Sequence, residues 1–185
     1  GFDGPRLRIV RHEHNRGIAE AYNTIIREGR GELIAMLGDD DVCEPDRIAR
    51  QVAVFDRHPD TGVAHGAASI IDGEGVQRGM WPSQDRARHE LLRHLVREHN
   101  TLVDPSRMVH RRVYEAVGGY SSDFRLAQDF DFWVRAVRAF RFRDVPGGPL
   151  IGLRRHGDNF SDESAQALEI EEVQNALRSL FAAAP

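Results

Sequence analysis

Apolar residues recur along this chain in two alternating rhythms, one with the period of a strand and one with the period of a helix. Short apolar runs between turn residues predict strands at 7–10, 32–37, 62–71 and 150–155. Apolar residues three or four positions apart predict helices at 18–28, 45–59, 85–96, 111–117, from about 129 onward, and at 170–180. Strands that alternate with helices are typical of a layered α/β fold.

The same periodicity predicts which side chains face the core. On the helix that follows Pro45, we expect Ile48, Val52 and Phe55 to form the buried face, because these positions share one side of a helix. The last helix carries a similar apolar stripe, formed by Ile170, Val173, Leu177 and Leu180.

The composition is that of a globular protein and excludes several classes. Of the 185 residues, 41% are hydrophobic and 29% are charged, as in ordinary globular domains. The net charge of −4 gives no basic footprint, so nucleic acid is not an expected partner. The single cysteine, Cys43, excludes an internal disulfide and indicates a reducing compartment. No stretch is long and apolar enough to span a bilayer, and a chain that begins with Gly1 is expected to be a piece of a longer protein.

Three consecutive carboxylates, Asp39, Asp40 and Asp41, follow the predicted strand 32–37. Like charges this close repel one another unless a cation lies among them, and hard divalent cations prefer oxygen ligands. Ligands also bind at strand ends in open α/β sheets. The sequence therefore predicts a Mg²⁺ or Mn²⁺ site that holds a phosphate-bearing ligand. The alternative is a solvated turn, in which Asp46 caps the next helix.

A second acidic pair, Asp129 and Asp131, opens a predicted helix. Asp in a first turn caps a helix and complements its dipole, and Asp131 stands four residues before Arg135, as in an ordinary surface pair. Residues two apart on a helix face different directions, so at most one of the two carboxylates points into a site. The functional alternative is that Asp129 faces the ligand as a general base.

A basic stretch follows the last predicted strand. Arg154, Arg155 and His156 have the charge to neutralise a diphosphate, and histidine also binds metal. The other histidines show no ligand spacing, and His65 is expected to be an ordinary residue of its strand. Cys43 is expected to be a small apolar filler near the acidic residues.

Several short motifs follow one another in order along the chain. The first half holds Asn15-Arg16-Gly17-Ile18-Ala19-Glu20-Ala21-Tyr22-Asn23, Gly31-Glu32, Gly38-Asp39-Asp40-Asp41 and Pro45. The second half holds Val117-Gly118-Gly119-Tyr120, Gln128-Asp129-Phe130-Asp131-Phe132-Trp133-Val134-Arg135 and Arg154-Arg155-His156. This ordered set, from about Asn15 to Ser161, resembles the family 2 inverting glycosyltransferases. The first group is similar to their nucleotide-sugar half and the second to their acceptor half.

The resemblance implies a GT-A fold, which is a Rossmann-like α/β fold with a mixed sheet flanked by helices. The implied donor-binding residues are Asn15, Gly17, Asn23, Asp39, Asp40 and Arg155. The implied metal ligands, for Mg²⁺ or Mn²⁺, are Asp40, Asp41 and His156, and the implied catalytic base is Asp129. The implied partners are a nucleotide-sugar donor and a carbohydrate or lipid-linked acceptor. The expected location is cytoplasmic, including a peripheral position at the inner membrane face.

The chain also departs from the family pattern. Gly38 stands where many members have Asp, which shifts the acidic motif, and Gln128 stands where Glu is common. The strand, helix and strand that normally hold the nucleotide base are missing before Asn15. We therefore expect a fold truncated at its N-terminus, with an exposed sheet edge that is open to pairing with a second copy.

We expect one glycosyltransferase-like domain over residues 1–185. Residues 1–60 would form the remainder of the nucleotide-sugar half, 61–161 the acceptor half and 162–185 a C-terminal helix. The expected activity is metal-dependent transfer of a sugar to an acceptor hydroxyl with inversion. A non-catalytic remnant that binds a nucleotide-sugar or a partner protein is an alternative, which the missing N-terminal unit favours. A metal-dependent phosphohydrolase would explain the acidic residues but not the ordered motifs.

Overall fold

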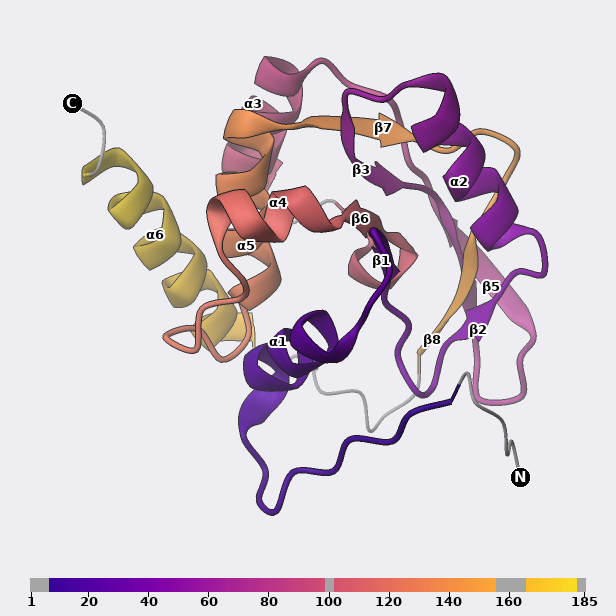
Figure 1. Cartoon of the computed structure of the whole chain (residues 1–185), viewed down its shortest axis with the longest axis horizontal. Helices are drawn as coiled ribbons and strands as arrows, with labels where there is room; N and C mark the ends of the chain where they lie inside the picture. The colour runs from indigo at the N-terminus through magenta and orange to yellow at the C-terminus, as the bar shows by residue number, and fades with distance from the viewer. Residues whose placement is uncertain (1–6, 99–101, 156–165, 183–185) are drawn as a thin grey trace.

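The computed structural model describes residues 7–98, 102–155 and 166–182 (Figure 1). Its helices are α1 (Gly17–Glu28), α2 (Arg47–Arg57), α3 (Arg88–Glu98), α4 (Arg111–Val117), α5 (Gln128–Ala139) and α6 (Gln166–Ala182), with one 3₁₀ turn, η1 (Asp104–Ser106). Its strands are β1 (Leu33–Ala35), β2 (Val42–Cys43), β3 (Thr61–His65), β4 (Ala68–Ile71), β5 (Gln77–Trp81), β6 (Met108–His110), β7 (Arg141–Asp144) and β8 (Ile151–Arg154). The predicted helices are all present, and α4 has the predicted bounds.

The strands form two mixed four-stranded sheets, which confirms the predicted α/β class. One sheet has the order β1-β6-β3-β7 and the other the order β2-β8-β4-β5. In the first sheet, β6 runs antiparallel to β1 and β3, whereas β3 and β7 are parallel. In the second, β8 is parallel to β4 and antiparallel to β2. It follows that β1, β3 and β7 point the same way, so that their C-terminal ends lie at one edge of the first sheet.

The single strand predicted at 62–71 is in fact two strands, β3 and β4, which belong to different sheets. The chain crosses between the sheets at Gly66, where a Cβ atom would lie only 2.6 Å from Leu150 Cδ1. A side chain at this position would clash with a buried residue, so the crossing requires glycine. The backbone N–H of Leu150 donates to Ala67 O (2.9 Å) and holds the chain just after the crossing.

The strand predicted at 7–10 is wrong, because these residues are exposed and belong to neither sheet. A strand forms only where a neighbouring strand meets its backbone hydrogen bonds, and an apolar sequence does not supply that neighbour. Conversely, β2, β5, β6 and β7 carry little sequence signal. The strand β6 has only three residues and exists because it pairs with β1 and β3 at once.

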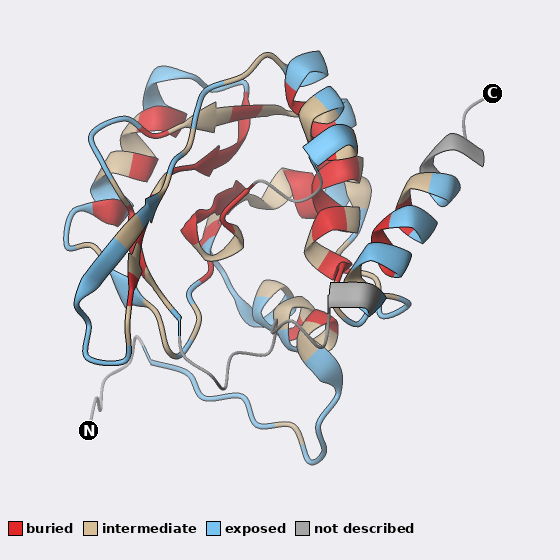
Figure 2. Ribbon diagram, turned by 180° about the vertical axis from the view of Figure 1, so that it is seen from behind, coloured by how far each residue is buried: buried red, intermediate tan, exposed pale blue. Residues whose placement is uncertain are grey.

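Two clusters of buried side chains form the core of the described residues (Figure 2). The larger is centred on α5, where Phe130, Phe132 and Trp133 are at most 1% exposed. Helices α3, α4 and α6 all pack against α5. The smaller cluster includes side chains of α2, β3, β4 and β8.

Helix α2 buries polar side chains where the sequence predicts apolar ones. Its buried residues are Arg47, Gln51, Val54 and Phe55. Ile48, which the periodicity places on the inner face, is 49% exposed. Of the predicted face, Phe55 is buried and Val52 packs, partly buried, against the smaller cluster. The prediction is therefore wrong at Ile48, although the helix itself is correctly placed.

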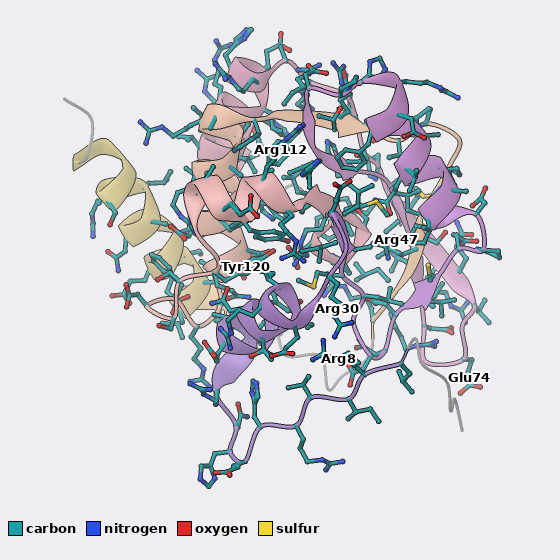
Figure 3. All side chains as sticks on the ribbon, viewed as in Figure 1. Arg8, Arg30, Arg47, Glu74, Arg112 and Tyr120 are labelled. Carbon is teal, nitrogen blue, oxygen red and sulfur yellow. The ribbon has the colours of Figure 1, made fainter. Side chains whose placement is uncertain are left out.

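Backbone carbonyl groups at the strand ends explain this polar face. Arg47 Nη2 donates to Met36 O (2.9 Å) just after β1 and to Arg107 O (3.0 Å) just before β6. Its Nε donates to Gln51 Oε1 (2.9 Å). Buried carbonyl groups need donors, so the guanidinium of Arg47 faces inward (it is labelled in Figure 3).

Gln51 donates hydrogen bonds to two further buried carbonyl groups beside α2. Its Nε2 donates to Ala64 O (3.1 Å) in β3 and to Ser106 O (2.9 Å) in η1. The hydroxyl of Ser106 in turn donates to Gly66 O (2.9 Å) and accepts from Gly66 N (3.2 Å). Helix α2 therefore fastens the ends of β1, β3 and β6 to one another.

Helix α6 packs with part of the predicted stripe, because Val173 is buried and Leu177 packs, partly buried, against the larger cluster. Glu172, Val173 and Ala176 are buried, whereas Ile170 is 41% exposed. The stripe is therefore wrong at Ile170, and the side chain of Leu180 lies outside those that the structure describes. No helix within the described ranges is long and apolar enough to cross a membrane.

We expect Gln51→Leu to destabilise the protein much more than Ile48→Ala. The first change leaves two buried carbonyl groups and Arg47 Nε without partners, so the free energy of unfolding should fall by about 2–4 kcal/mol. The second truncates a half-exposed side chain and should cost about 1 kcal/mol or less. Urea unfolding followed by circular dichroism measures both changes, and equal losses would contradict the buried face described above.

Candidate active site

One edge of the first sheet gathers polar segments from across the chain (Figure 1). The acidic residues 39–41 follow β1, and β3 and β7 end there at His65 and Asp144. The strand β6 runs in the opposite direction and so begins at this edge, directly after η1. Helix α5 leads into the start of β7, so its first turn, which holds Asp129, lies toward the same edge. Such edges bind ligands in open α/β sheets.

The carboxylates of Asp40 and Asp41 lie close to each other over Gly38. A Cβ atom on Gly38 would be 3.1 Å from Asp40 Oδ1 and 3.0 Å from Asp41 Oδ2. A larger residue there would press on both carboxylates, whereas Asp39 is exposed. The glycine that departs from the family pattern therefore leaves room for two neighbouring carboxylates.

Arg154 holds the acidic loop in place from β8. Its backbone N–H donates to Asp41 Oδ1 (3.0 Å), and its Nε donates to Asp40 O (2.8 Å). Its Nη1 donates to the carbonyl groups of Asp72 (2.7 Å) and Gly73 (2.8 Å) in the turn after β4. Arg154 thus shapes the loop, and Arg155 is the next basic residue along the chain.

The electrostatics of the acidic loop favour an added cation. Burial raises the pKa of Asp41, the hydrogen bond from Arg154 lowers it, and the negative charge of Asp40 raises it again. Arg155, which is exposed, lowers the pKa of Asp41 through its positive charge. Two neighbouring carboxylates in a partly buried loop repel each other, and a divalent cation relieves that repulsion.

The described ranges contain no group of three His, Cys, Asp or Glu side chains that could hold a metal ion. Asp40 and Asp41 therefore provide at most part of a ligand set within these ranges. His156, the third ligand that the resemblance implies, lies outside the described residues.

Asp129 and Asp131 diverge, as their spacing predicts. Asp131 accepts hydrogen bonds from Nε (3.0 Å) and Nη2 (2.6 Å) of Arg135, which confirms the predicted pair. Asp129 Oδ1 accepts the N–H of Phe130 (2.7 Å). Burial is the main cause that raises the pKa of Tyr22 to about 12, and the negative charge of Asp129 contributes to this shift. Asp129 therefore lies near Tyr22 of α1.

A carboxylate from another helix accepts the backbone N–H groups just before α5. Glu172 of α6 accepts the backbone N–H groups of Arg125 (2.9 Å), Leu126 (2.7 Å) and Ala127 (2.9 Å). Ala127 occupies the N-cap position and has no side-chain acceptor. Asp129, two residues further on, is therefore not the N-cap residue of this helix.

The sequence matches a known family, and its relatives are longer. Residues 2–118 match the description "Glycosyl transferase family 2". The chain belongs to this family. An uncharacterised glycosyltransferase of Methanocaldococcus jannaschii is 27% identical over 133 residues, which are 71% of this chain and 45% of the relative. The chondroitin synthase of Escherichia coli is 27% identical over 162 residues, which are 85% of this chain and 22% of the relative. The chain thus spans less than half the length of these family 2 relatives.

Solved structures share the fold of this family 2 chain at low sequence identity. Residues 1–349 of S. aureus TarS, in complex with UDP-GlcNAc, have a TM-score of 0.61 and 15% identity, over 82% of this chain and 43% of that TarS chain. The mannosyltransferase PcManGT of Pyrobaculum calidifontis, in complex with GDP-Man and Mn²⁺, has a TM-score of 0.58 and 16% identity, over 95% of this chain and 47% of PcManGT. The fold is therefore of the GT-A type, as the resemblance implies.

The first predicted donor-binding residues of the family 2 motif have local structural partners. Asn15 Oδ1 accepts Gly17 N (2.9 Å), and Gly17 adopts a positive φ of 81° that favours glycine. Asn23 donates through Nδ2 to Tyr120 O and accepts from Tyr120 N, both at 2.8 Å. These bonds shape the start of α1 and join it to the loop before α5. A donor-binding role for Asn15, Gly17 and Asn23 stays a prediction.

Two hollows border the start of α1 in this family 2 domain. One of about 1120 Å³ lies between residues 7–17 and α1. The other, of about 560 Å³, lies between the start of α1 and the loop that contains Ser122, Phe124 and Arg125. Asn15 and Gly17 line both hollows.

The expectation for Cys43 is wrong, whereas the expectation for His65 is confirmed. Cys43 is exposed, because β2 is an edge strand, so the expectation that it fills an apolar gap is wrong. His65 is buried in β3 and its Nδ1 lies 2.9 Å from Ser83 Oγ. Burial lowers the pKa of His65 to about 4, so it is a neutral strand residue, as expected.

Sequence reasoning misses the buried residues behind Asp129. Asp104 and Arg107 form a buried ion pair, and the guanidinium of Arg107 lies over the ring of Tyr22. Asp104 precedes Pro105, and in the sequence alone this combination indicates a turn. The only local signal is the spacing of three between Asp104 and Arg107, which brings the two side chains together in a single helical turn.

We expect Asp41→Asn to stabilise the protein at neutral pH, because asparagine keeps an acceptor for Arg154 N and carries no buried charge. The folded state raises the pKa of Asp41. The ionised carboxylate of Asp41 therefore destabilises the folded state. This effect is absent at low pH and develops as the pH rises from the ordinary pKa of Asp to the raised folded-state pKa. Since Asp41 is half-exposed, screening limits the gain at pH 7 to about 1 kcal/mol or less.

Urea unfolding at pH 3 and pH 7 checks this expectation. Asp39→Asn is the matched control, because Asp39 is exposed and should give no gain at either pH. An Asp41→Asn variant that is equally stabilised at both pH values, or not stabilised at pH 7, would contradict the argument.

Proposed function

We propose that this chain carries the transfer centre of an inverting, metal-dependent glycosyltransferase. The observation that carries the proposal is the position of Asp129. It opens α5 toward the sheet edge that holds the acidic loop, in a chain of family 2. Glu172 accepts the backbone N–H groups of the segment just before α5, so Asp129 is not the N-cap residue, although its Oδ1 also accepts the first-turn N–H of Phe130.

In the proposed reaction, Asp129 is the general base. Its carboxylate takes the proton of the acceptor hydroxyl while the hydroxyl oxygen forms a bond to the anomeric carbon of the donor sugar. The bond between that carbon and the diphosphate oxygen breaks at the same time, and the electron pair leaves with the nucleoside diphosphate. A single displacement of this kind inverts the anomeric centre.

Asp40 and Asp41 would hold the divalent ion. The fit rests on two carboxylate oxygens that both approach Gly38 and on the pKa of Asp41, which burial and then the charge of Asp40 raise. When bound, Mg²⁺ or Mn²⁺ supplies positive charge to the leaving diphosphate. PcManGT, which shares the fold, was solved with GDP-Man and Mn²⁺. Arg155 and His156 are proposed to add positive charge.

The proposed donor is a nucleoside diphosphate sugar, since TarS and PcManGT were solved with UDP-GlcNAc and GDP-Man. The hollows beside Asn15 and Gly17 support a donor site at the start of α1. The proposed acceptor is a carbohydrate or lipid-linked hydroxyl, and the proposed location is cytoplasmic or at the inner membrane face. β1 is an edge strand, which supports the proposal that a second copy pairs there.

We expect Asp129→Asn to abolish transfer while leaving donor binding and stability nearly unchanged. Asparagine keeps the size of the side chain but loses its proton affinity, so the loss should appear in the chemical step. Transfer rate, donor affinity and melting temperature are measured together. Asp131→Asn is the matched control, because Asp131 pairs with Arg135 and should leave transfer intact. An active, stable Asp129→Asn protein would remove the proposed mechanism.

Mn²⁺ titration in the presence of a nucleoside diphosphate tests the metal site. We expect Asp40→Asn to weaken Mn²⁺ binding by about tenfold or more, because it removes one of two adjacent charged ligands. Equal calorimetric affinities for the parent and the variant would exclude the site. Donor binding by a parent protein that shows no transfer would instead support the non-catalytic binding module.

A further inference from the structure

A buried guanidinium lies in an aromatic cage behind the proposed transfer centre. Arg107 is 1% exposed. Its Cζ lies 5.1 Å from the ring centroids of Tyr22 and Trp133 and 5.5 Å from that of Tyr120. Arg107 pairs with Asp104, which precedes it by three residues. Tyr120, labelled in Figure 3, packs against Tyr22 of α1, so the cage joins α1 to the segment that leads into α5.

The cage is buried and rich in polar atoms. Among the described residues, five buried atoms of the cage meet no partner at strict hydrogen-bond geometry, namely Asp104 Oδ1, Arg107 Nε and Nη2, Tyr120 Oη and Trp133 Nε1. The side chains of Trp133 and Tyr22 nevertheless lie close enough to Asp104 to lower its pKa against the effect of burial. Burial is the largest single effect and lowers the pKa of Arg107, but Asp104 and the phenols of Tyr120, Tyr114 and Tyr22 together raise it well above its ordinary value. Arg107 is therefore a permanent cation whose field is little screened by water.

Trp133 of the cage belongs to the helix that carries the proposed base, and Tyr22 lies close enough to Asp129 for its pKa to respond to that charge. Trp133 stands four residues after Asp129, so both side chains lie on the same face of α5. The pKa of Tyr22 is raised first by burial and then by the charges of Asp104 and Asp129, while Arg107 lowers it. Asp129, Tyr22 and the buried pair thus act on one another over short distances.

We propose that the Asp104–Arg107 pair is a positioning device for Asp129, which fixes Tyr22 and Trp133 and sets the charge that Asp129 experiences. The inference rests on the proposed function, because it gives the pair a role in transfer. The pair touches no substrate and acts through the two aromatic residues. Because Asp104 and Arg107 carry opposite charges, removing one of them changes the charge that acts on Tyr22 and on the nearby Asp129.

Removing one charge of the pair tests this directly. In Asp104→Asn, Arg107 is left as an unpaired cation, and we expect the pKa of Asp129 to fall by about one pH unit. Carbon-13 NMR of labelled aspartate measures this pKa in the protein without substrate, and the Asp129 signal is assigned by its loss in Asp129→Asn. The control is Asp85→Asn, which removes the acid from the exposed Asp85–Arg141 pair and should not move it. A folded Asp104→Asn protein with an unchanged Asp129 pKa would overturn the proposal.

A second measurement covers the case in which Asp104→Asn does not fold. A difluorotyrosine at position 22 ionises nearer neutral pH than tyrosine, and its pKa can be followed by fluorine NMR. Because coupling between two sites is reciprocal, Asp129→Asn should lower this phenol pKa, whereas Asp131→Asn should change it much less. An equal effect of the two variants, or none, would overturn the proposal.

The transfer assay then separates the two proposals. In Asp104→Asn, the acidic limb of the kcat profile should move to lower pH by the same amount as the Asp129 pKa, with the KM for the donor unchanged. A loss of rate without a shift of this limb would indicate a merely structural pair and overturn the positioning role. Coupling between Asp104 and Asp129 in a parent protein that shows no transfer would remove the proposed function and leave the electrostatic coupling standing.

Discussion

The buried polar face of α2 is the constraint on which the rest of the structure depends. Arg47 and Gln51 donate to carbonyl groups after β1, before β6 and within β3, and so fix three neighbouring strands at one edge. The chain crosses from one sheet to the other at Gly66, which Ser106 holds at the same place. One helix therefore sets both the edge that carries the acidic loop and the junction of the two sheets.

The acidic residues at this edge differ in how their charge is neutralised. Asp131 is paired with Arg135, Asp104 with Arg107, and Glu172 accepts three backbone N–H groups. Asp40 and Asp41 instead lie against each other, and their repulsion contributes to the raised pKa of Asp41. A bound cation would relieve the repulsion between two adjacent carboxylates, which supports the proposed metal position at residues 39–41.

Sequence reasoning succeeds where the determinants are local and fails where they are distant. The helix at 111–117 and the divergence of Asp129 from Asp131 follow from spacing and are present. The polar face of α2 follows from carbonyl groups of segments far away in sequence, and no periodicity contains them. The strand β6 depends on two partners rather than on its own three residues. The hydrogen bonds from Glu172 to the segment before α5 join positions 45 to 47 residues apart, so they too lie beyond local rules.

The two predicted halves of the chain share one core, and this bears on how the site is held. α1 belongs to the nucleotide-sugar half, yet Asn23 makes two hydrogen bonds to the backbone of Tyr120 in the acceptor half. Tyr22 packs on Tyr120 and lies over Arg107. Because the same aromatic cluster includes Trp133 of α5, the position of Asp129 depends on a helix from the opposite half. We therefore expect a change at Tyr22 to reach the proposed base through these packed rings.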